Sequence, residues 1–398
     1  MNLFFLKSLL RGKLLTTPKF EELLHQTDAN QERYRRVEKM DKVKEYLDLD
    51  KKVSTPEFQS KKKEIHDVVY ADTAEAKALA ELKKLGKDKY VRLYLKNGSE
   101  EGRISVQRYL VLKEETQTPE FQQRNAFWAN PDRWYTTEEG KMDARYEELK
   151  KDSDIDFFIH TDVHAIEHYE QFDLVFEDDF NWNGLKNSDW KPGFIYPNDK
   201  FVPVHSYTNE KQAYVGGRNI ETVDSKLYII THEENCEGPA WDSEKGMVMK
   251  NFTYSSDAIY TDKVAIKVGS VVQVKVRCHG LLNHGIYLRS KNHVPFISLF
   301  GYTGLKLFCG VKDSLYHDKN LKYLDGLQPL VSTVFTVSWQ KDEIVWFVNN
   351  LEVFRTKNLI PEGEELYLHM YSFLFENVRV ASEGDLEVDW VRVFQNKE

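Results

Sequence analysis

Aromatic side chains gather in one short stretch of the C-terminal half, and aromatic rings are side chains that commonly line ligand clefts. Tyr287, Phe296, Phe300 and Tyr302 all fall in this stretch. A cleft that binds small molecules is usually lined by such rings, with a few polar groups beside them. Large aromatic side chains are also those most often buried in a core. The stretch is therefore a candidate ligand-contact site, with core packing as the competing interpretation.

Histidines near this stretch do not form a pattern that predicts metal chemistry. His279, His284 and His293 cluster there, but no acidic residues at metal-ligand spacing accompany them. Ordinary loop or strand histidines are therefore the favoured interpretation. Arg289 and Lys291 could pair with an acidic sugar, although solvated surface charge explains them as well.

The composition fits a folded protein with no nucleic-acid partner. An apolar fraction of 41% and an aromatic fraction of 13% are enough to build a core. The net charge of −9 and the pI near 5.8 argue against nucleic-acid binding, which requires a basic face. The cysteines have no CxxC spacing and predict buried free thiols, not a disulfide framework or a zinc site: Cys236, Cys278 and Cys309.

From about residue 170 onward, apolar and polar residues alternate at the period of β-strands. Residues 272–278 and 335–340 alternate in this way, which gives each strand one buried and one solvated face. Asn349-Asn350, between residues 344–348 and 351–354, predicts a tight hairpin turn. Further strands are expected at residues 227–231, 366–371 and 386–394. Many short strands predict an all-β sandwich.

Taken in order, these segments resemble the laminarinase-type members of glycoside hydrolase family 16, over residues 166–398. Residues 174–180 (LVFEDDF) resemble the family's first strand, and residues 386–395 (LEVDWVRVFQ) resemble its closing strand. Residues 335–353 match its tryptophan strand and following hairpin, with Asn-Asn where the family has Asn/Asp-Gly. The resemblance implies a concanavalin A-like antiparallel jelly roll.

The resemblance also places the family's active strand, which carries Glu-x-Asp-x-x-Glu, on residues 296–301. A retaining glycosidase needs two carboxyls about 5.5 Å apart on one face. A bulge in the strand lets the last acid reach the face of the first two. Here Phe296, Ser298 and Gly301 stand at the three positions, and none can supply a carboxyl group. The nearest acids, Asp262 and Asp313, lie outside this segment, so we expect no catalytic residues.

The resemblance implies two kinds of ligand contact outside the active strand. Trp241, Tyr371 and Phe373 lie in segments that border the family's sugar cleft, and they join the four aromatic residues above as expected glycan contacts. Asp179 and Asp389 stand near the first and last strands, where family members hold a structural calcium ion. Carboxylates suit that ion, but two acids alone do not make a site. No other cofactor is expected.

The first 165 residues contain a repeat built from helix starts. Thr-Pro-Glu-Phe-Gln at residues 55–59 returns 63 positions later at residues 118–122, and Leu-Tyr-Leu at residues 93–95 matches Phe-Phe-Ile at residues 157–159. Threonine caps a helix, proline suits its first position and glutamate favours its N-terminal end. We expect a helical segment at residues 1–45 and two similar units within residues 46–165. Alternation at residues 90–95 and 103–112 suggests a short hairpin in this region.

The first fifteen residues have no apolar run long enough for a signal peptide, and no stretch of the chain reaches the roughly 20 apolar residues of a membrane span. We expect a short amphipathic helix that docks on a partner or on the rest of the chain, with a membrane-surface anchor as the less favoured alternative. The compartment stays open: cytoplasmic by default, or within an exported or viral particle.

The expected function is a non-catalytic carbohydrate-binding, structural or adhesion protein with a lectin-like sandwich, within a larger assembly such as an appendage or virion. Two alternatives stay open. One is an active family 16-like glycoside hydrolase acting on a β-glucan or related polysaccharide through displaced acids. The other is a purely structural assembly protein that binds only protein. The expected partners are a polysaccharide or other glycan, and a protein bound through the helical region.

Overall fold

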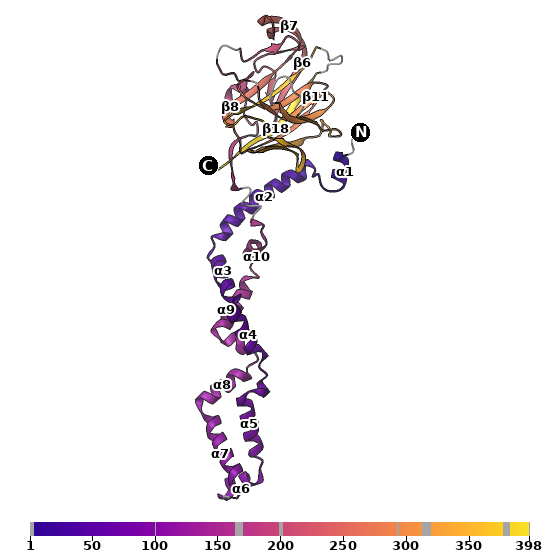
Figure 1. The fold of residues 1–398 in the computed structure, drawn as a ribbon. Helices are drawn as coiled ribbons and strands as arrows, with labels where there is room; N and C mark the ends of the chain where they lie inside the picture. Colours follow the sequence, from indigo (N-terminus) through magenta and orange to yellow (C-terminus); the bar gives the residue numbers. More distant parts are fainter. Residues whose placement is uncertain are drawn as a thin grey trace. The chain divides into compact units, whose positions relative to one another are not determined.

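The computed structural model describes residues 4–99, 101–163, 170–198, 202–292, 294–312, 320–376 and 383–397 (Figure 1). The chain divides into two compact units. One contains Met1–Thr27 and Val163–Glu398, and the other contains Asp28–Asp162. The first 27 residues therefore group with the sandwich and are not part of a separate segment 1–45.

The described N-terminal region is almost entirely helical. Its α-helices are α1 (Phe4–Leu10), α2 (Thr17–Glu38), α3 (Asp41–Val53), α4 (Pro56–Asp67), α5 (Ala74–Leu85), α6 (Lys89–Asn97), α7 (Arg103–Gln117), α8 (Pro119–Ala129), α9 (Glu138–Leu149) and α10 (Ser153–His160). Two 3-10 turns interrupt them, η1 (Tyr70–Asp72) and η2 (Arg133–Thr136). None of the described helices is both long and apolar enough to cross a membrane.

The Thr-Pro-Glu-Phe motif starts a helix in both copies, as predicted. Thr55 caps α4 by accepting a hydrogen bond from the backbone N–H of Phe58 at 3.3 Å. Thr118 caps α8 by accepting one from Phe121 at the same distance. The order α3-α4-η1-α5-α6 recurs as α7-α8-η2-α9-α10, so the repeat extends over five successive elements.

The two copies pack reciprocally, with the early helices of each copy on the later helices of the other. Between α3 and α9, Arg145 donates to Glu45 at 2.9 Å; between α7 and α5, Arg108 donates to Glu81 at 2.8 Å. The acid lies on α3 in the first pair, whereas the base lies on the equivalent helix α7 in the second. Phe58 on α4 also packs edge-on against Trp134 of η2, at 5.5 Å between ring centroids. The contacts thus run from the early elements of each segment to the later elements of the other.

The hairpin suggested by residues 90–95 and 103–112 is wrong, because both stretches are helices. Asp88 caps α6 by accepting hydrogen bonds from the backbone N–H groups of Tyr90, at 2.8 Å, and Val91, at 3.3 Å. Gly98, at φ 76°, ends α6 in the left-handed conformation. A short alternation of β-prone residues does not by itself exclude a helix, and these end signals decide between the two.

The C-terminal region is an antiparallel sandwich of two sheets, as predicted. The larger sheet is 11-stranded: β1 (Phe172–Asp178), β3 (Ser206–Tyr207), β4 (Gln212–Tyr214), β5 (Ile220–Thr222), β6 (Leu227–Asp242), β7 (Gly246–Ser256), β9 (Ser270–Cys278), β14 (Thr333–Trp339), β15 (Glu343–Val348), β16 (Leu351–Lys357) and β18 (Gly384–Asn396). The second sheet is 7-stranded and runs in the order β13 (Leu321–Tyr323), β12 (Leu307–Lys312), β11 (Phe296–Thr303), β10 (Asn283–Arg289), β17 (Leu366–Phe373), β8 (Ala258–Ile266) and β2 (Lys191–Pro192). Among the strands that the structure describes, only β3 and β4 pair in parallel, β3 with β6 and β4 with β7. A 3-10 turn, η3 (Leu185–Asn187), precedes β2.

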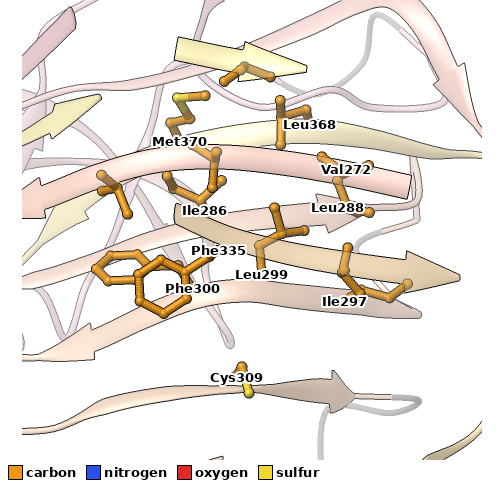
Figure 2. Packing of buried hydrophobic residues seen from close by; sticks show 14 of the residues in the cluster. Val272, Ile286, Leu288, Ile297, Leu299, Phe300, Cys309, Phe335, Leu368 and Met370 are labelled. Carbon is orange, nitrogen blue, oxygen red and sulfur yellow. The ribbon is translucent and has the colours of Figure 1, made fainter. Parts of the chain in front are cut away.

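One apolar core lies between the two sheets. Figure 2 shows side chains of β10, β11 and β17 from the second sheet meeting those of β9 and β14 from the larger one. Phe300 on β11 packs edge-on against Phe335 on β14, with ring centroids 5.0 Å apart. Cys278 and Cys309 are buried free thiols in this core, as predicted, whereas Cys236 is free but half-buried.

The N-terminal strap, residues 4–21, docks on the sandwich, which confirms one of its two predicted roles. Phe5 and Leu14 are buried in the sandwich core cluster. The expected hairpin turn between β15 and β16 holds the strap: the Asn349 side-chain N–H donates to the Leu15 carbonyl at 2.8 Å, and that of Asn350 donates to the Lys13 carbonyl at 2.8 Å. The Asn-Asn turn therefore has a structural use of its own.

Candidate functional site

The strand expected to carry the catalytic acids is β11, and it contains the expected bulge. Ile286 on β10 pairs with Phe300, whereas the next residue, Tyr287, pairs with Ser298. Leu299 is therefore an extra residue in β11. A bulge of this kind changes which side chains share a face beyond it.

The bulge places the three acid positions on one face of the second sheet. Ile297, Leu299, Phe300 and Tyr302 all belong to the core cluster between the sheets. The remaining positions, Phe296, Ser298 and Gly301, point to the opposite face, which we call the groove face. Three side-chain positions of β11 therefore share the groove face, and none of them carries a carboxyl group.

Aromatic rings fill the space directly over these positions. A Cβ atom added to Gly301 would lie 2.2 Å from the Phe308 ring, so this ring covers the third position. On β10, a Cβ atom added to Gly285 would lie 1.8 Å from the ring of Tyr287. Phe296 packs edge-on against Tyr287, with ring centroids 5.4 Å apart. These rings occupy the volume that acid side chains would need.

A second layer comes from the segment after β2. Phe194 is 4% exposed and packs against Tyr371 on β17, at 5.4 Å between ring centroids, and against His369, at 6.1 Å. The guanidinium carbon of Arg289 lies 5.1 Å from the centre of the Phe194 ring. Gly193, at φ 89°, lets the chain enter here, because a Cβ atom would lie 2.3 Å from the Pro203 carbonyl oxygen.

Two of the predicted glycan contacts lie on the core face. Phe300 is 2% exposed and Tyr302 is 6% exposed, both within the core cluster. The Tyr302 hydroxyl donates to the Gly304 carbonyl at 2.7 Å. Tyr302 also borders a pocket of about 350 Å³ between residues 302–307 and 324–329, at an end of the sandwich. Neither ring faces the groove, because the bulge turns both toward the larger sheet.

The other five predicted contacts differ in exposure. Tyr287 is buried under its neighbours, while Phe296, Tyr371 and Phe373 are half-buried. Trp241, at the end of β6, is 37% exposed. Tyr287 stacks on Tyr371 at 5.2 Å, and Tyr371 packs against Phe373 at 5.4 Å. The structure thus joins Tyr287, Phe296, Tyr371 and Phe373 in one aromatic cluster.

A buried acid beside this cluster was not predicted from the sequence. Glu210 is 5% exposed, and its Oε2 accepts hydrogen bonds from the Tyr207 backbone N–H at 2.8 Å and from the Gln212 side chain at 3.0 Å. Burial raises the pKa of Glu210 to about 7, against the opposing effect of these donors. Burial raises the pKa of Tyr371 to about 12, with Glu210 as a smaller contributor. Glu210 forms an isolated antiparallel β-bridge with Phe375, a contact between distant segments that gives no local signal in the sequence.

Other acids near the second sheet have structural partners. Asp257 accepts hydrogen bonds from the backbone N–H groups of Gly217 and Asn219, both at 2.9 Å, and burial raises its pKa to about 6. Asp262 forms an ion pair with Lys191 at 2.6 Å. Asp313 lies outside the described residues.

The described residues offer no assembled metal site. They contain no group of three or more histidine, cysteine or acidic side chains that could hold an ion. Asp389 pairs with Lys275 at 2.7 Å, so a cation already neutralises it, and Asp179 is exposed. Hard-cation sites need several oxygen ligands, which the implied calcium site at these two acids does not gather.

The three histidines have different surroundings. His284 is buried with its Nδ1 atom 2.8 Å from the Ser372 hydroxyl, and burial lowers its pKa to about 4. His279 pairs with Asp385 at 2.8 Å. His293 lies outside the described residues. A neutral buried His284 fits the interpretation of ordinary structural histidines.

Comparison with known proteins gives similarity to solved structures only. No protein-family model and no curated protein matches the chain. The endo-β-1,3-glucanase from Pyrococcus furiosus is 17% identical, with 57% of this chain and 95% of that chain covered, at a TM-score of 0.45. The laminarinase catalytic domain from Thermotoga maritima MSB8 is 16% identical, with coverages of 57% and 100% and a TM-score of 0.44. SCLam, a non-specific endo-β-1,3(4)-glucanase from family GH16, is 18% identical, with coverages of 57% and 92% and a TM-score of 0.47. Identities and TM-scores this low support no argument about the site. Its interpretation therefore rests on the strands and side chains of this chain.

Proposed function

We propose that this chain is a non-catalytic structural or adhesion protein, in which the sandwich is a binding module and the helical unit provides attachment to a protein. One observation carries the proposal. Phe296, Ser298 and Gly301 share the groove face of β11 without a carboxyl group, and the Phe308 ring covers Gly301. Cleavage by a retaining glycosidase requires two carboxyls about 5.5 Å apart.

The displaced-acid alternative has one supporting observation. A carboxyl with a pKa of about 7 suits proton transfer near neutral pH, and Glu210 has such a pKa. However, Glu210 already accepts hydrogen bonds from Tyr207 and Gln212, and Asp257 accepts two from the backbone. These contacts favour structural roles for both acids.

Glycan binding is the second candidate function. The favouring observation is that aromatic rings remain partly accessible at the edges of the groove face: Trp241 is 37% exposed, and Phe373 is half-buried against Phe375, which is 40% exposed. Exposed rings of this kind can stack on sugars. Against it, Phe194 fills the centre of the face, where a bound chain would pass.

The test uses the full chain in two assays: release of reducing ends from laminarin and related β-glucans, and binding on a glycan array. We expect no turnover, and no turnover after Phe194→Ala, which removes the ring from the groove face. Turnover that Glu210→Gln abolishes would instead establish the displaced-acid enzyme. Array binding that Trp241→Ala or Phe373→Ala abolishes would establish glycan recognition, provided that unfolding by urea is unchanged. Thr303→Ala, at an exposed residue of β11, is the control for both assays.

A further inference from the structure

The turn between β15 and β16 binds the backbone of the N-terminal strap. The Asn350 carboxamide forms two hydrogen bonds with it: the side-chain N–H donates to the Lys13 carbonyl at 2.8 Å, and the side-chain oxygen accepts from the Leu15 N–H at 2.7 Å. The Asn349 side-chain N–H donates to the Leu15 carbonyl at 2.8 Å. A carboxamide carries both a donor and an acceptor, so it can pair with a peptide backbone whatever the side chains are. The turn is therefore suited to hold a peptide segment.

Side chains on both sides of these hydrogen bonds decide which segment fits. Leu14 lies between the two bound residues and is buried in the sandwich core cluster. Thr17 is buried as well, and its hydroxyl donates to the Ser332 carbonyl at 2.7 Å. A buried donor that loses its acceptor costs free energy, as does an apolar pocket that is left empty. The site is therefore selective for a leucine followed by a threonine three positions later.

An ion pair in a part-buried position completes the site. The Glu21 carboxylate accepts hydrogen bonds from the Lys275 ammonium at 2.8 Å and from the Trp390 indole N–H at 3.2 Å. Lys275, whose side chain is 16% exposed, also pairs with Asp389 at 2.7 Å. The strap thus supplies one of two acids that neutralise this lysine. A hydrogen bond between charged groups is stronger than one between neutral groups, so an acid at position 21 adds to the selectivity.

The strap can leave this site without disturbing the sheets. The first strand of the sandwich, β1, begins at Phe172, so all the strand pairings described above lie after the strap in the chain. The chain leaves this compact unit after Thr27 and returns to it at Val163. The two Asn350 hydrogen bonds are exposed, so water competes with them. We expect the strap to open locally, at a free energy below that of global unfolding.

A second copy of the chain carries the same segment. Its strap presents the same backbone groups, leucine, threonine and acid, so it can make every contact that a strap makes with its own sandwich. Exchange of identical segments between copies therefore loses none of these contacts, which makes it a low-cost route to association. A strap near its own sandwich has a high effective concentration, so high protein concentration or alignment within an assembly favours exchange.

We propose that this site binds the strap of a second copy, so that exchanged straps link chains. We call it the strap site and define it by the residues that form hydrogen bonds with the strap: Lys275, Ser332, Asn349, Asn350 and Trp390. The ligand is thus a peptide segment of this chain, recognised through its backbone and through Leu14, Thr17 and Glu21. The inference goes beyond the proposed function, and it does not depend on what the groove face binds.

Two full-length variants that cannot close on themselves test the proposal. Leu14→Asp with Thr17→Ala disables the strap of the first variant and leaves its strap site open. Asn349→Gly, Asn350→Gly and Lys275→Glu together disable the strap site of the second variant and leave its strap free. An equimolar mixture should form a complex in sedimentation velocity that neither variant forms alone. The matched control adds Leu14→Asp to the second variant, which disables its strap as well, and should not form the complex.

A labelled peptide with the sequence of residues 4–27 measures the same binding directly. Fluorescence anisotropy should show that it binds the first variant, whose strap site is open. Leu14→Asp in the peptide should weaken binding by about tenfold or more, because it places a charge in an apolar pocket. Glu21→Gln in the peptide should weaken binding about fivefold, through loss of the charge on one partner of Lys275.

The wild-type chain provides a test without destabilising substitutions. Two populations with different tags should co-purify after incubation together, with a yield that rises with protein concentration and falls when free peptide is in excess. The proposal would be overturned by the absence of co-purification, or by co-purification that the peptide does not reduce. It would also be overturned if the two variants kept the near-UV circular dichroism of wild type but formed no complex, or if Leu14→Asp left peptide binding unchanged. A failure here leaves the groove-face assays unaffected.

Discussion

The helical unit and the sandwich each keep a backbone pattern while changing the side chains that the pattern presents. In the helical unit, α6 and α10 share their cap and first buried residue, yet one helix is basic and the other acidic. In the sandwich, β11 keeps the bulge and the three aligned positions, but they carry a ring, a hydroxyl and a glycine. In both regions, the helix caps, the bulge and the core-facing side chains thus do not determine which side chains the surface carries.

The two regions differ in how their interiors are built. The sandwich has one large apolar core, whereas the helical unit has small clusters, such as Val53, Phe58 and Trp134, supplemented by exposed ion pairs. Exposed pairs contribute little to stability, so the helical unit depends more on its helix ends and few buried side chains. Variants in the sandwich core should therefore have the largest effects, and variants at helix caps the smallest.

The largest expected change in the free energy of unfolding comes from substitutions on β11, and it should differ between the two faces of that strand. Phe300→Ala should lower the free energy of unfolding by about 3–5 kcal/mol, because it leaves a cavity between the sheets. Phe296→Ala, on the half-buried groove face, should cost only about 1–2 kcal/mol. Urea unfolding followed by near-UV circular dichroism measures both. Equal costs would contradict the assignment of opposite faces.

Next in size is the pH effect of Glu210. Its pKa is about 7 in the folded protein and near 4.5 when exposed, so the folded state holds the proton more tightly. The associated stability is present below pH 4.5 and is lost as the pH rises toward 7, by at most about 3 kcal/mol. Glu210→Gln should therefore be more stable than wild type at pH 8 and should lose that advantage at low pH. Urea unfolding at both pH values measures the difference.

The control for this prediction is Glu221→Gln, at an exposed carboxylate on β5. This substitution removes an exposed carboxyl group in place of a buried one, and it is the reference for the same two measurements. If Glu210→Gln behaved like this control, Glu210 would be ionised in the folded protein and the buried neutral acid would be excluded.

Substitutions in the turn between β15 and β16, which holds the N-terminal strap, should lower stability by a smaller amount. Asn349 has φ 49° and accepts a hydrogen bond from the Val334 backbone N–H at 3.0 Å while donating to Leu15. Asn349→Gly keeps this conformation but leaves these backbone groups unpaired, at a cost of about 2 kcal/mol. Trypsin cleavage after Lys13 should accelerate, as measured by mass spectrometry.

Asn350→Gly provides the matched comparison. It removes only the more exposed hydrogen bonds to Lys13 and Leu15. Its unfolding cost should be smaller, about 0.5–1 kcal/mol. Unchanged cleavage in both variants would mean that Phe5 and Leu14 alone hold the strap.

The sequence predicted the elements whose signals are local. The Thr-Pro-Glu-Phe motif marked two helix starts, Asn349-Asn350 marked a hairpin turn, and alternation marked the strands. The assignment of residues 296–301 to a bulged strand was also correct. The helix caps, the turn and the alternation depend on residues that are close together in the chain, so their spacing is visible without the fold, whereas the bulged strand was placed by the family resemblance.

Features that depend on distant contacts could not be predicted in this way. The bulge turns Phe300 into the core, which alternation counted from Phe296 does not reveal. Phe194 packs on the groove face from about a hundred residues upstream of β11, and Glu210 bridges to Phe375, which is more than 160 residues away in the chain. The reciprocal packing of the helical repeats was not predictable either, because the repeat shows similarity but not which copy contacts which.

The smallest expected effect tests the equivalence of the two helical repeats. Thr55→Ala and Thr118→Ala each remove the side chain that accepts the N–H of the third residue of the following helix, at 3.3 Å in both copies. Each should lower the free energy of unfolding of the helical unit by about 1 kcal/mol, the usual cost of losing a cap. Serine at either position keeps the hydroxyl and should restore most of the loss, as followed by far-UV circular dichroism. Phe58 and Phe121 are each the one buried residue of their helix, and Phe58 also packs on the buried Trp134, so a larger cost at Thr55 would show that the two copies differ in how much packing each cap supports.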